Sequence, residues 1–99
     1  MAYLLELHQA NVEPYLADVQ RISPAVREII QRGLDELAEH AEFYLTNPHY
    51  RIAGTPYFQF DRILRDPETG KLRGFYFVVS DEAAQFGVLR IVYLDEKNS

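Results

Sequence analysis

The pattern of apolar and polar residues changes its period near the middle of the chain. Between residues 12 and 45 apolar residues recur every three or four positions, which predicts amphipathic helices. From residue 57 onward they alternate with a period of two and are rich in aromatic and β-branched types, which predicts strands. The run "YLLEL" at residues 3–7 predicts one further strand ahead of the helices. The predicted order is therefore strand, helix, helix and three strands.

The helical half divides at Ser23, which is a favourable N-cap and is followed by Pro24, a favourable first helical residue. Pro14 fits only in a first turn, so we expect the first helix to begin near residues 11–13. Pro48 ends the second helix, and Gly33 inside it is expected to permit close approach of the first helix. The first helix presents the apolar residues Val12, Leu16, Val19 and Ile22, and the second presents Val26, Ile30, Leu34, Leu37, Ala41 and Tyr44.

The strand half contains three candidate strands, at residues 57–64, 72–79 and 86–94. The turns between them are short, and short connections join antiparallel neighbours. We therefore expect an N-terminal strand and two helices packed on one face of an antiparallel sheet that contains a three-strand meander. This is an α+β fold, and the 99 residues suffice for a single domain, residues 1–99.

The stretch "YFQFDRILR" at residues 57–65 divides into two faces, because side chains alternate across a strand. One face is mostly apolar and is expected to pack on the helices, with its arginine extended to solvent or paired. The other face is polar, and we expect it to be open and available for binding. The packed face comprises Phe58, Phe60, Arg62 and Leu64, and the open one Tyr57, Gln59, Asp61, Ile63 and Arg65.

Composition excludes several classes of chemistry. The chain has no cysteine, which excludes disulfides, thiolate zinc sites and a cysteine nucleophile. Its three histidines are far apart in sequence, so we expect no metal and no cofactor. No apolar run approaches the roughly 20 residues of a membrane span, and the N-terminus does not resemble a signal peptide. We therefore expect a cytoplasmic protein without membrane contact.

The charge is unevenly distributed along the chain. The net charge of −5 argues against broad non-specific binding of nucleic acid. Residues 1–46 hold three arginines against eight acidic residues, whereas residues 47–99 are neutral. The window from Arg51 to Arg73 carries a small positive excess, so any anion-binding surface should lie there. A solvated mixture of surface charges explains the same window, and both interpretations stay open.

Three stretches of the chain resemble the RelE/ParE-like toxins of bacterial toxin–antitoxin systems. "MAYLLELH" is similar to the first strand of that family, and "SPAVREIIQRGLDELAEH" to its second helix. "YRIAGTPYFQFDRILRDPETGKLRGFYFVVSD", followed by "VLRIVYL", resembles its sheet. The resemblance covers most of the chain and is closer to the RelE branch.

The resemblance implies an mRNA interferase, a ribosome-dependent endoribonuclease that needs no metal. In that branch, basic residues on the sheet and a C-terminal tyrosine promote attack of a 2′-hydroxyl on the adjacent phosphate. Fixed cations stabilise the extra negative charge that develops on the phosphorus centre. The implied partners are a cognate antitoxin and the messenger RNA on the ribosome.

Carried over by position, most of this apparatus is substituted. Arg73 matches the family's strand arginine, but Gln59 and Asp61 stand where RelE has lysines. The basic residue after the last strand falls at "DEK", which displaces it to Lys97, and the chain ends before a C-terminal helix with a tyrosine. The candidate catalytic residues are Arg73, Arg65, Tyr76 and Tyr93, and the candidate RNA-binding residues are Arg51, Arg62, Arg90 and Lys97.

Three functions remain open from the sequence. The first is the interferase, with Arg73 and Arg65 on or at the rim of the open face and Asp61 opposing their charge. The second is a non-catalytic member of the same fold that binds an antitoxin or a topoisomerase, and the acidic charge and the substitutions favour it chemically. The third is an unrelated α+β interaction module.

Overall fold

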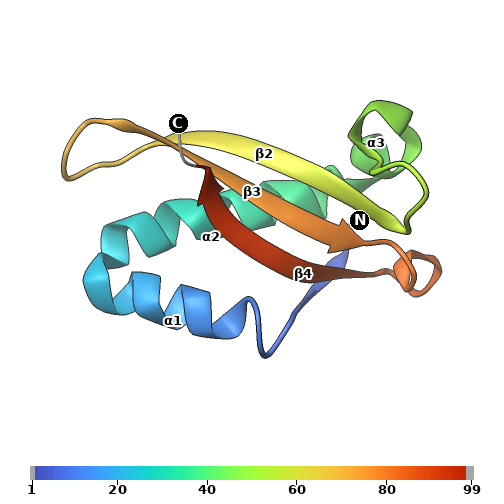
Figure 1. Ribbon diagram of the computed structural model, residues 1–99, viewed down its shortest axis with the longest axis horizontal. Helices are drawn as coiled ribbons and strands as arrows, with labels where there is room; N and C mark the ends of the chain where they lie inside the picture. Colours follow the sequence, from blue (N-terminus) through green and yellow to red (C-terminus); the bar gives the residue numbers. More distant parts are fainter. Residues whose placement is uncertain (1, 98–99) are drawn as a thin grey trace.

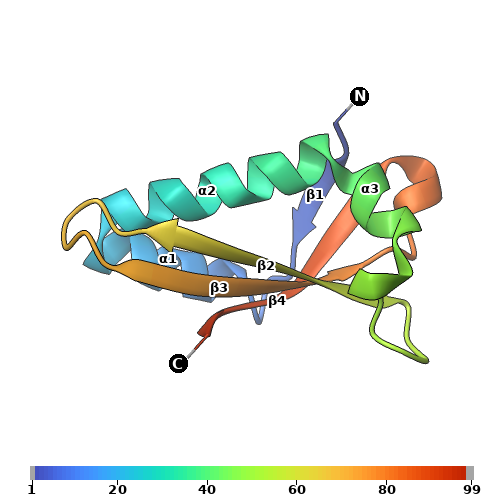
Figure 2. The ribbon, with the colours of Figure 1, turned by 90° about the horizontal axis from the view of Figure 1, so that it is seen from above.

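A four-stranded β-sheet carries the helices on one of its two faces (Figures 1 and 2). The structure is a computed structural model and describes residues 2–97. The fold is α+β, as the change of period predicted. In chain order the elements are β1 (Leu4–Leu7), α1 (Glu13–Ile22), α2 (Pro24–Glu39), α3 (Ala41–Thr46), the 3-10 turn η1 (Pro48–Tyr50), β2 (Tyr57–Arg65), β3 (Leu72–Ser80), the 3-10 turn η2 (Ala84–Phe86) and β4 (Val88–Lys97).

The strands lie in the order β1-β4-β3-β2. The predicted meander is confirmed, because β2 pairs antiparallel with β3 and β3 antiparallel with β4. The expectation of a wholly antiparallel sheet is wrong, because β1 pairs with β4 in parallel, from Leu4 beside Val88 to Leu7 beside Ile91. Parallel neighbours need a long crossover, and everything between β1 and β4 supplies it. Short turns in the sequence predict the antiparallel pairs of the meander, but they do not predict how β1 pairs.

The second predicted helix begins as expected and ends early. The Ser23 side chain accepts a hydrogen bond from the Val26 N–H at 3.3 Å, and Pro24 occupies the first helical position. His40, however, leaves helical geometry with φ −111° and ψ 22°, so the single predicted helix is two, α2 and α3. Figure 2 shows α3 turning from the end of α2 toward the start of β2. This turn brings Tyr44 onto Phe60, with ring centroids 4.7 Å apart.

The core lies between α2 and the aromatic face of the sheet. The predicted helical stripe is buried from Val26 to Ala41, opposite Phe58 and Phe60 of β2 and Phe75 and Phe77 of β3. The predicted packed face of β2 is thus confirmed. Since side chains alternate across a strand, these four phenylalanines all lie on the helix-covered face of the sheet.

Three sequence expectations are wrong. Ile22, assigned to the apolar residues of the first helix, is 75% exposed. Phe86, predicted to begin the last strand, belongs to η2 and is 77% exposed, and β4 begins at Val88. Gly33 does not admit the first helix. A Cβ built on it would lie 3.6 Å from the Phe77 ring and 3.8 Å from the Cγ of Arg62, so this glycine faces the sheet.

Candidate functional site

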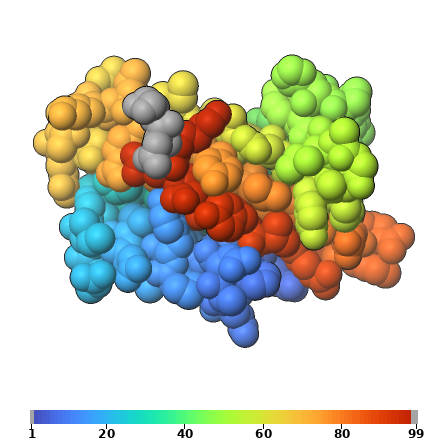
Figure 3. All heavy atoms as spheres, viewed as in Figure 1, coloured from blue at the N-terminus to red at the C-terminus, as the bar shows by residue number. Residues whose placement is uncertain are grey.

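The sheet face opposite the helices is the candidate site that the alternation of β2 predicted. We call it the open face, and define it by Gln59, Asp61, Ile63, Arg65, Leu72, Tyr76, Tyr93 and Lys97. Burial alternates along β2 as expected, with these positions half-buried or exposed. Figure 3 is viewed toward this face and shows atoms of β3 and β4, in orange and red, at the surface. The open face therefore takes side chains from β2, β3 and β4.

Arg73 lies on the opposite, helix-covered face, so the prediction that it lies on or at the rim of the open face is wrong. The alternation of β3 places it with Phe75, and its guanidinium carbon lies 5.5 Å from the centroid of that ring. Its Nε and one terminal nitrogen donate to the two carboxylate oxygens of Glu96 at 2.9 and 2.6 Å. The other terminal nitrogen donates to Asp66 at 3.3 Å. Arg73 thus joins β3, the end of β4 and the β2–β3 hairpin.

The pKa values of this cluster follow from its hydrogen bonds. Those from Arg73 lower the pKa of Glu96 below its ordinary value, although partial burial opposes the shift. The Glu68 backbone N–H lowers the pKa of Asp66, and the Arg73 guanidinium adds to that shift. Glu96 in turn raises the pKa of Arg73. All three groups are therefore charged at neutral pH, and Arg73 forms ion pairs with both carboxylates.

Asp61 pairs with a lysine instead of the expected arginine. Its carboxylate accepts a hydrogen bond from Lys97 Nζ at 2.8 Å and another from Gln59 Nε2 at 2.9 Å. Lys97 reaches it because β4 extends to residue 97, so that the predicted basic residue beyond the last strand lies within the strand. Partial burial alone would raise the pKa of Asp61, but these two hydrogen bonds outweigh it and lower the pKa. Arg65 instead donates to the Gly70 carbonyl at 2.5 Å.

The remaining candidate RNA-binding arginines are also paired, and they do not converge. Arg62 forms an ion pair with Glu36 of α2 on the helix-covered face, which confirms the expectation that it extends or pairs. The distance from Arg51 to Asp81 is 2.6 Å, and that from Arg90 to Glu6 is 3.0 Å. The cations proposed for RNA binding are thus distributed over both faces of the sheet.

The two candidate tyrosines do lie together on the open face. The ring centroids of Tyr76 and Tyr93 are 5.8 Å apart, and the Tyr93 hydroxyl donates to Asp95 at 3.3 Å. Proximity to Tyr76 and to the Asp95 carboxylate raises the pKa of Tyr93. A raised pKa makes the phenolate harder to form, which is unfavourable for a general base near neutral pH.

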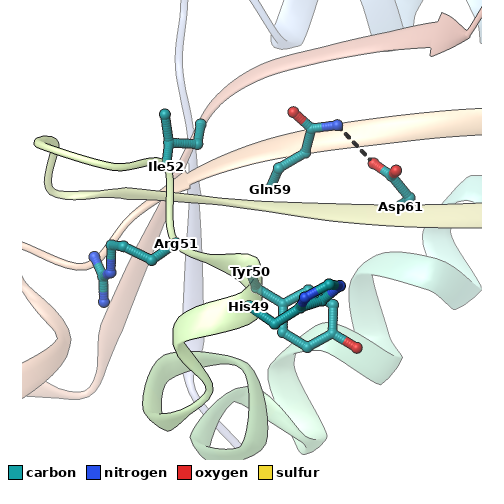
Figure 4. Close-up of a pocket in the computed structure, with 6 residues that line it drawn as sticks. All are labelled: His49, Tyr50, Arg51, Ile52, Gln59 and Asp61. Atoms are coloured by element: carbon teal, nitrogen blue, oxygen red, sulfur yellow. Dashed lines mark hydrogen bonds between the residues drawn. The ribbon is translucent and has the colours of Figure 1, made fainter.

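A hollow of about 330 Å³ lies between the segment at residues 49–52 and the start of β2 (Figure 4). Its lining includes Gln59 and Asp61, which are joined by a hydrogen bond. The side chain of Arg51 extends away from that pair, toward its own partner Asp81. Arg51 is the one arginine or lysine among the described residues that line the hollow, and it is paired with Asp81. The complete lining is His49, Tyr50, Arg51, Ile52, Gln59 and Asp61.

Sequence reasoning missed the apolar part of the open face. Ile63 is 73% exposed and Leu72 is 63% exposed, and they are near neighbours because Ile63 lies opposite Gly74 and Arg65 opposite Leu72. An isoleucine at a polar-face position of an alternating strand was the available signal. Tyr93, 40% exposed, belongs to the same face.

Other kinds of site find little support. Within residues 2–97, no three histidine, cysteine, aspartate or glutamate side chains are grouped so that they could hold a metal ion. None of the described helices is long and apolar enough to cross a membrane. No protein-family model matches the chain, and neither a curated protein nor a solved structure is significantly similar to it. Functional inference therefore depends on the geometry of the chain itself.

Proposed function

We propose that this protein is a non-catalytic binding module that engages another protein through its open face. The resemblance to RelE/ParE-like toxins makes a cognate antitoxin the partner we propose. The observation that carries the proposal is the Asp61–Lys97 pair, because Asp61 stands where RelE has a lysine and neutralises the lysine that remains.

Ribonuclease chemistry by the RelE route requires cations that are free to meet a phosphate. A transition state with extra negative charge is stabilised by fixed positive groups aimed at it. Here a carboxylate lies 2.8 Å from Lys97, and a phosphate would have to displace it. Arg73 faces the helices and is held by Glu96 and Asp66. These pairings argue against mRNA interferase activity and for a role in protein binding.

The surface of the open face suits a protein partner. Ile63 and Leu72 supply exposed apolar area on one side of the Asp61–Lys97 pair and Tyr93 supplies more on the other side, and apolar area beside polar groups is typical of protein interfaces. Around them two carboxylates, Asp61 and Asp95, balance two cations, Arg65 and Lys97. A partner segment with apolar anchors, in a helix or an extended arm, matches this surface better than the uniform negative charge of RNA.

The first experiment co-expresses the protein with the product of the adjacent gene and measures binding by titration calorimetry. We expect co-purification at a fixed stoichiometry, and Leu72→Asp should weaken binding by on the order of tenfold or more, because a charge would be buried in the interface. Ile22→Asp is the matched control, since Ile22 is at least as exposed as Leu72, 75% against 63%, but lies outside the open face. If Leu72→Asp binds as tightly as the wild type and the Ile22→Asp control, the open face is not the interface. If the neighbour does not bind, the antitoxin assignment fails.

The second experiment tests for the interferase. Purified protein is added to a translating extract, and cleavage of the message is followed together with affinity for a single-stranded RNA at one salt concentration. We expect no cleavage and weak binding, while Asp61→Lys should tighten RNA binding by removing the carboxylate that neutralises Lys97. Message cleavage by the wild type would replace the binding module with the interferase.

A further inference from the structure

One long edge of the sheet is only partly covered. β1, at one edge, has four residues, whereas β2, at the other, has nine. The segment before β2 covers its beginning, through a bridge between Arg51 and Phe58 and a hydrogen bond of 2.9 Å from the Ile52 N–H to the Tyr57 carbonyl. In the part of the chain that the structure describes, nothing pairs with the rest of this edge, and Figure 1 shows β2 extending along the top of the sheet beyond that segment.

The hydrogen bonds at both ends of β2 identify which residues direct their backbone outward. The Pro56 carbonyl accepts from Asp81 at 3.2 Å and the Asp66 N–H donates to Lys71 at 2.8 Å, so even-numbered residues face β3. The Tyr57 carbonyl instead accepts from Ile52, so odd-numbered residues face the edge. Beyond the covered start, the outward residues are Asp61, Ile63 and Arg65. Pro67, next in the series, has no N–H to offer.

We propose that two copies of this chain associate through residues 61–65 of β2, antiparallel, with a two-fold axis at Ile63. Each outward residue then exchanges N–H and C=O bonds with its counterpart, and the two sheets become one continuous sheet. The axis sets Asp61 of each copy opposite Arg65 of the other. This inference is independent of the proposed function, because it requires no other protein.

The charges of the side chains favour the axis at Ile63 over an axis at Asp61 or at Arg62. An axis at Asp61 would place two carboxylates opposite each other, and an axis at Arg62 would place two guanidinium groups opposite each other. Like charges directly opposite across strands are destabilising, whereas opposite charges are favourable. The axis at Ile63 is also the one that uses the whole uncovered stretch. Both charges lie on the open face, where Asp61 already bonds Lys97 and can accept a further donor.

The same axis buries exposed apolar surface. Ile63 and Leu72 are adjacent on the open face and are the most exposed apolar residues of that face. Across the axis the isoleucines meet, which joins the two pairs into one apolar strip. Charged side chains often protect an edge from pairing, but here they are of opposite sign and symmetric about an isoleucine. An interface confined to one strand edge is small, so the dimer is weak and depends on concentration.

The experiment measures self-association by sedimentation velocity over a wide range of protein concentration. Wild type should shift from monomer to dimer, and Asp61→Arg or Arg65→Asp alone should weaken the dimer by on the order of tenfold or more, because each places like charges opposite each other twice. An equimolar mixture of these two variants should associate again, and so should the double variant, since both restore opposite charges. Ile63→Lys, which sets two cations on the axis, should be monomeric.

Arg90→Asp serves as the control, because Arg90 is an exposed cation of β4, away from the β2 edge, and its loss should leave the dimer unchanged. Circular dichroism verifies that every variant is folded. A wild type that stays monomeric at millimolar concentration would overturn the proposal. So would single variants that dimerise like the wild type, or a mixture of the two that fails to associate.

Discussion

Replacement of Arg73 by methionine separates the role that the sequence suggested for this residue from the role that its surroundings indicate. Methionine keeps an aliphatic side chain of similar length against Phe75 and removes the charge. If Arg73 belonged to an RNA site on the open face, as the family resemblance implies, its loss would abolish RNA binding and leave the stability normal. From its contacts with Glu96 and Asp66 we expect instead a loss of folding stability.

The magnitude follows from the hydrogen bonds that are lost. Arg73 makes a two-point contact with Glu96, and both side chains are about two-thirds buried. Hydrogen bonds to charged groups contribute roughly 1.5–3 kcal/mol, and Glu96 would remain without its cation, so we expect a loss of about 2–3 kcal/mol. For a domain of this size that lowers the melting temperature by about 10–20 °C. The lost contact with Asp66 acts in the same direction.

The pH dependence of the effect tests its cause. The folded-state pKa values of Glu96 and Asp66 lie below their ordinary values, so the stabilisation they provide is present above about pH 4 and is lost as the pH falls through the lower folded values. Without Arg73 the contribution of Glu96 largely disappears, whereas Asp66 keeps the part that comes from the Glu68 backbone N–H. The difference between wild type and Arg73→Met should therefore be largest at pH 7 and should shrink toward pH 3.

Urea unfolding at pH 7 and pH 3 measures both quantities. Arg90→Met is the matched control: Arg90 pairs with Glu6 across a largely exposed contact, and such pairs contribute only about 0–1 kcal/mol. A double-mutant cycle between Arg73→Met and Glu96→Gln should give a coupling free energy of at least about 1 kcal/mol. The reasoning is refuted if Arg73→Met unfolds within about 0.5 kcal/mol of the wild type, the usual effect of a surface substitution, or if the deficit is the same at both pH values.

Three further predictions concern the helix layer and are checked by thermal melting. Ile30 is fully buried, so Ile30→Asp should cost several kcal/mol and abolish the cooperative melt, and a transition close to that of the wild type would contradict the packing of α2. Gly33→Ala should raise the free energy of unfolding by up to about 1 kcal/mol, because alanine has a higher helix propensity than glycine. The new methyl would meet the Phe77 ring at 3.6 Å, an ordinary contact distance, so a lower melting temperature would show that the ring cannot accept it. Ser23→Ala removes the cap on the Val26 N–H and should cost about 1 kcal/mol, whereas no change would mean that Pro24 alone defines the start of α2.

Several features of the site were predictable because they follow from local chain geometry. Alternation along β2 by itself separates Phe58 and Phe60 from Gln59 and Asp61, and the burial of the strand agrees. The same rule, applied to "LRGFYFVV", places Arg73 on the face of Phe75. There the family resemblance, rather than the pattern, suggested the wrong face.

The partners of the charged residues could not be predicted in this way. Asp61 and Lys97 are far apart in sequence and meet because β4 crosses beside β3 and runs to its last described residue. Arg73 meets Glu96 for the same reason. The polarity of these residues is evident from the sequence, but the neutralisation of one by another depends on strand order and register.

By itself, the sequence determined the α+β class, the order of helices and strands, the start of α2 and the buried face of β2. Each of these depends on the periodicity of neighbouring residues or on a capping residue, and both act within a few positions of the chain. Only the tertiary structure decided that β1 runs parallel to β4, that the long helix divides at His40, and that half of the β2 edge remains uncovered. These features depend on which distant segments pack together, and that is set by the summed contacts of the whole core and sheet.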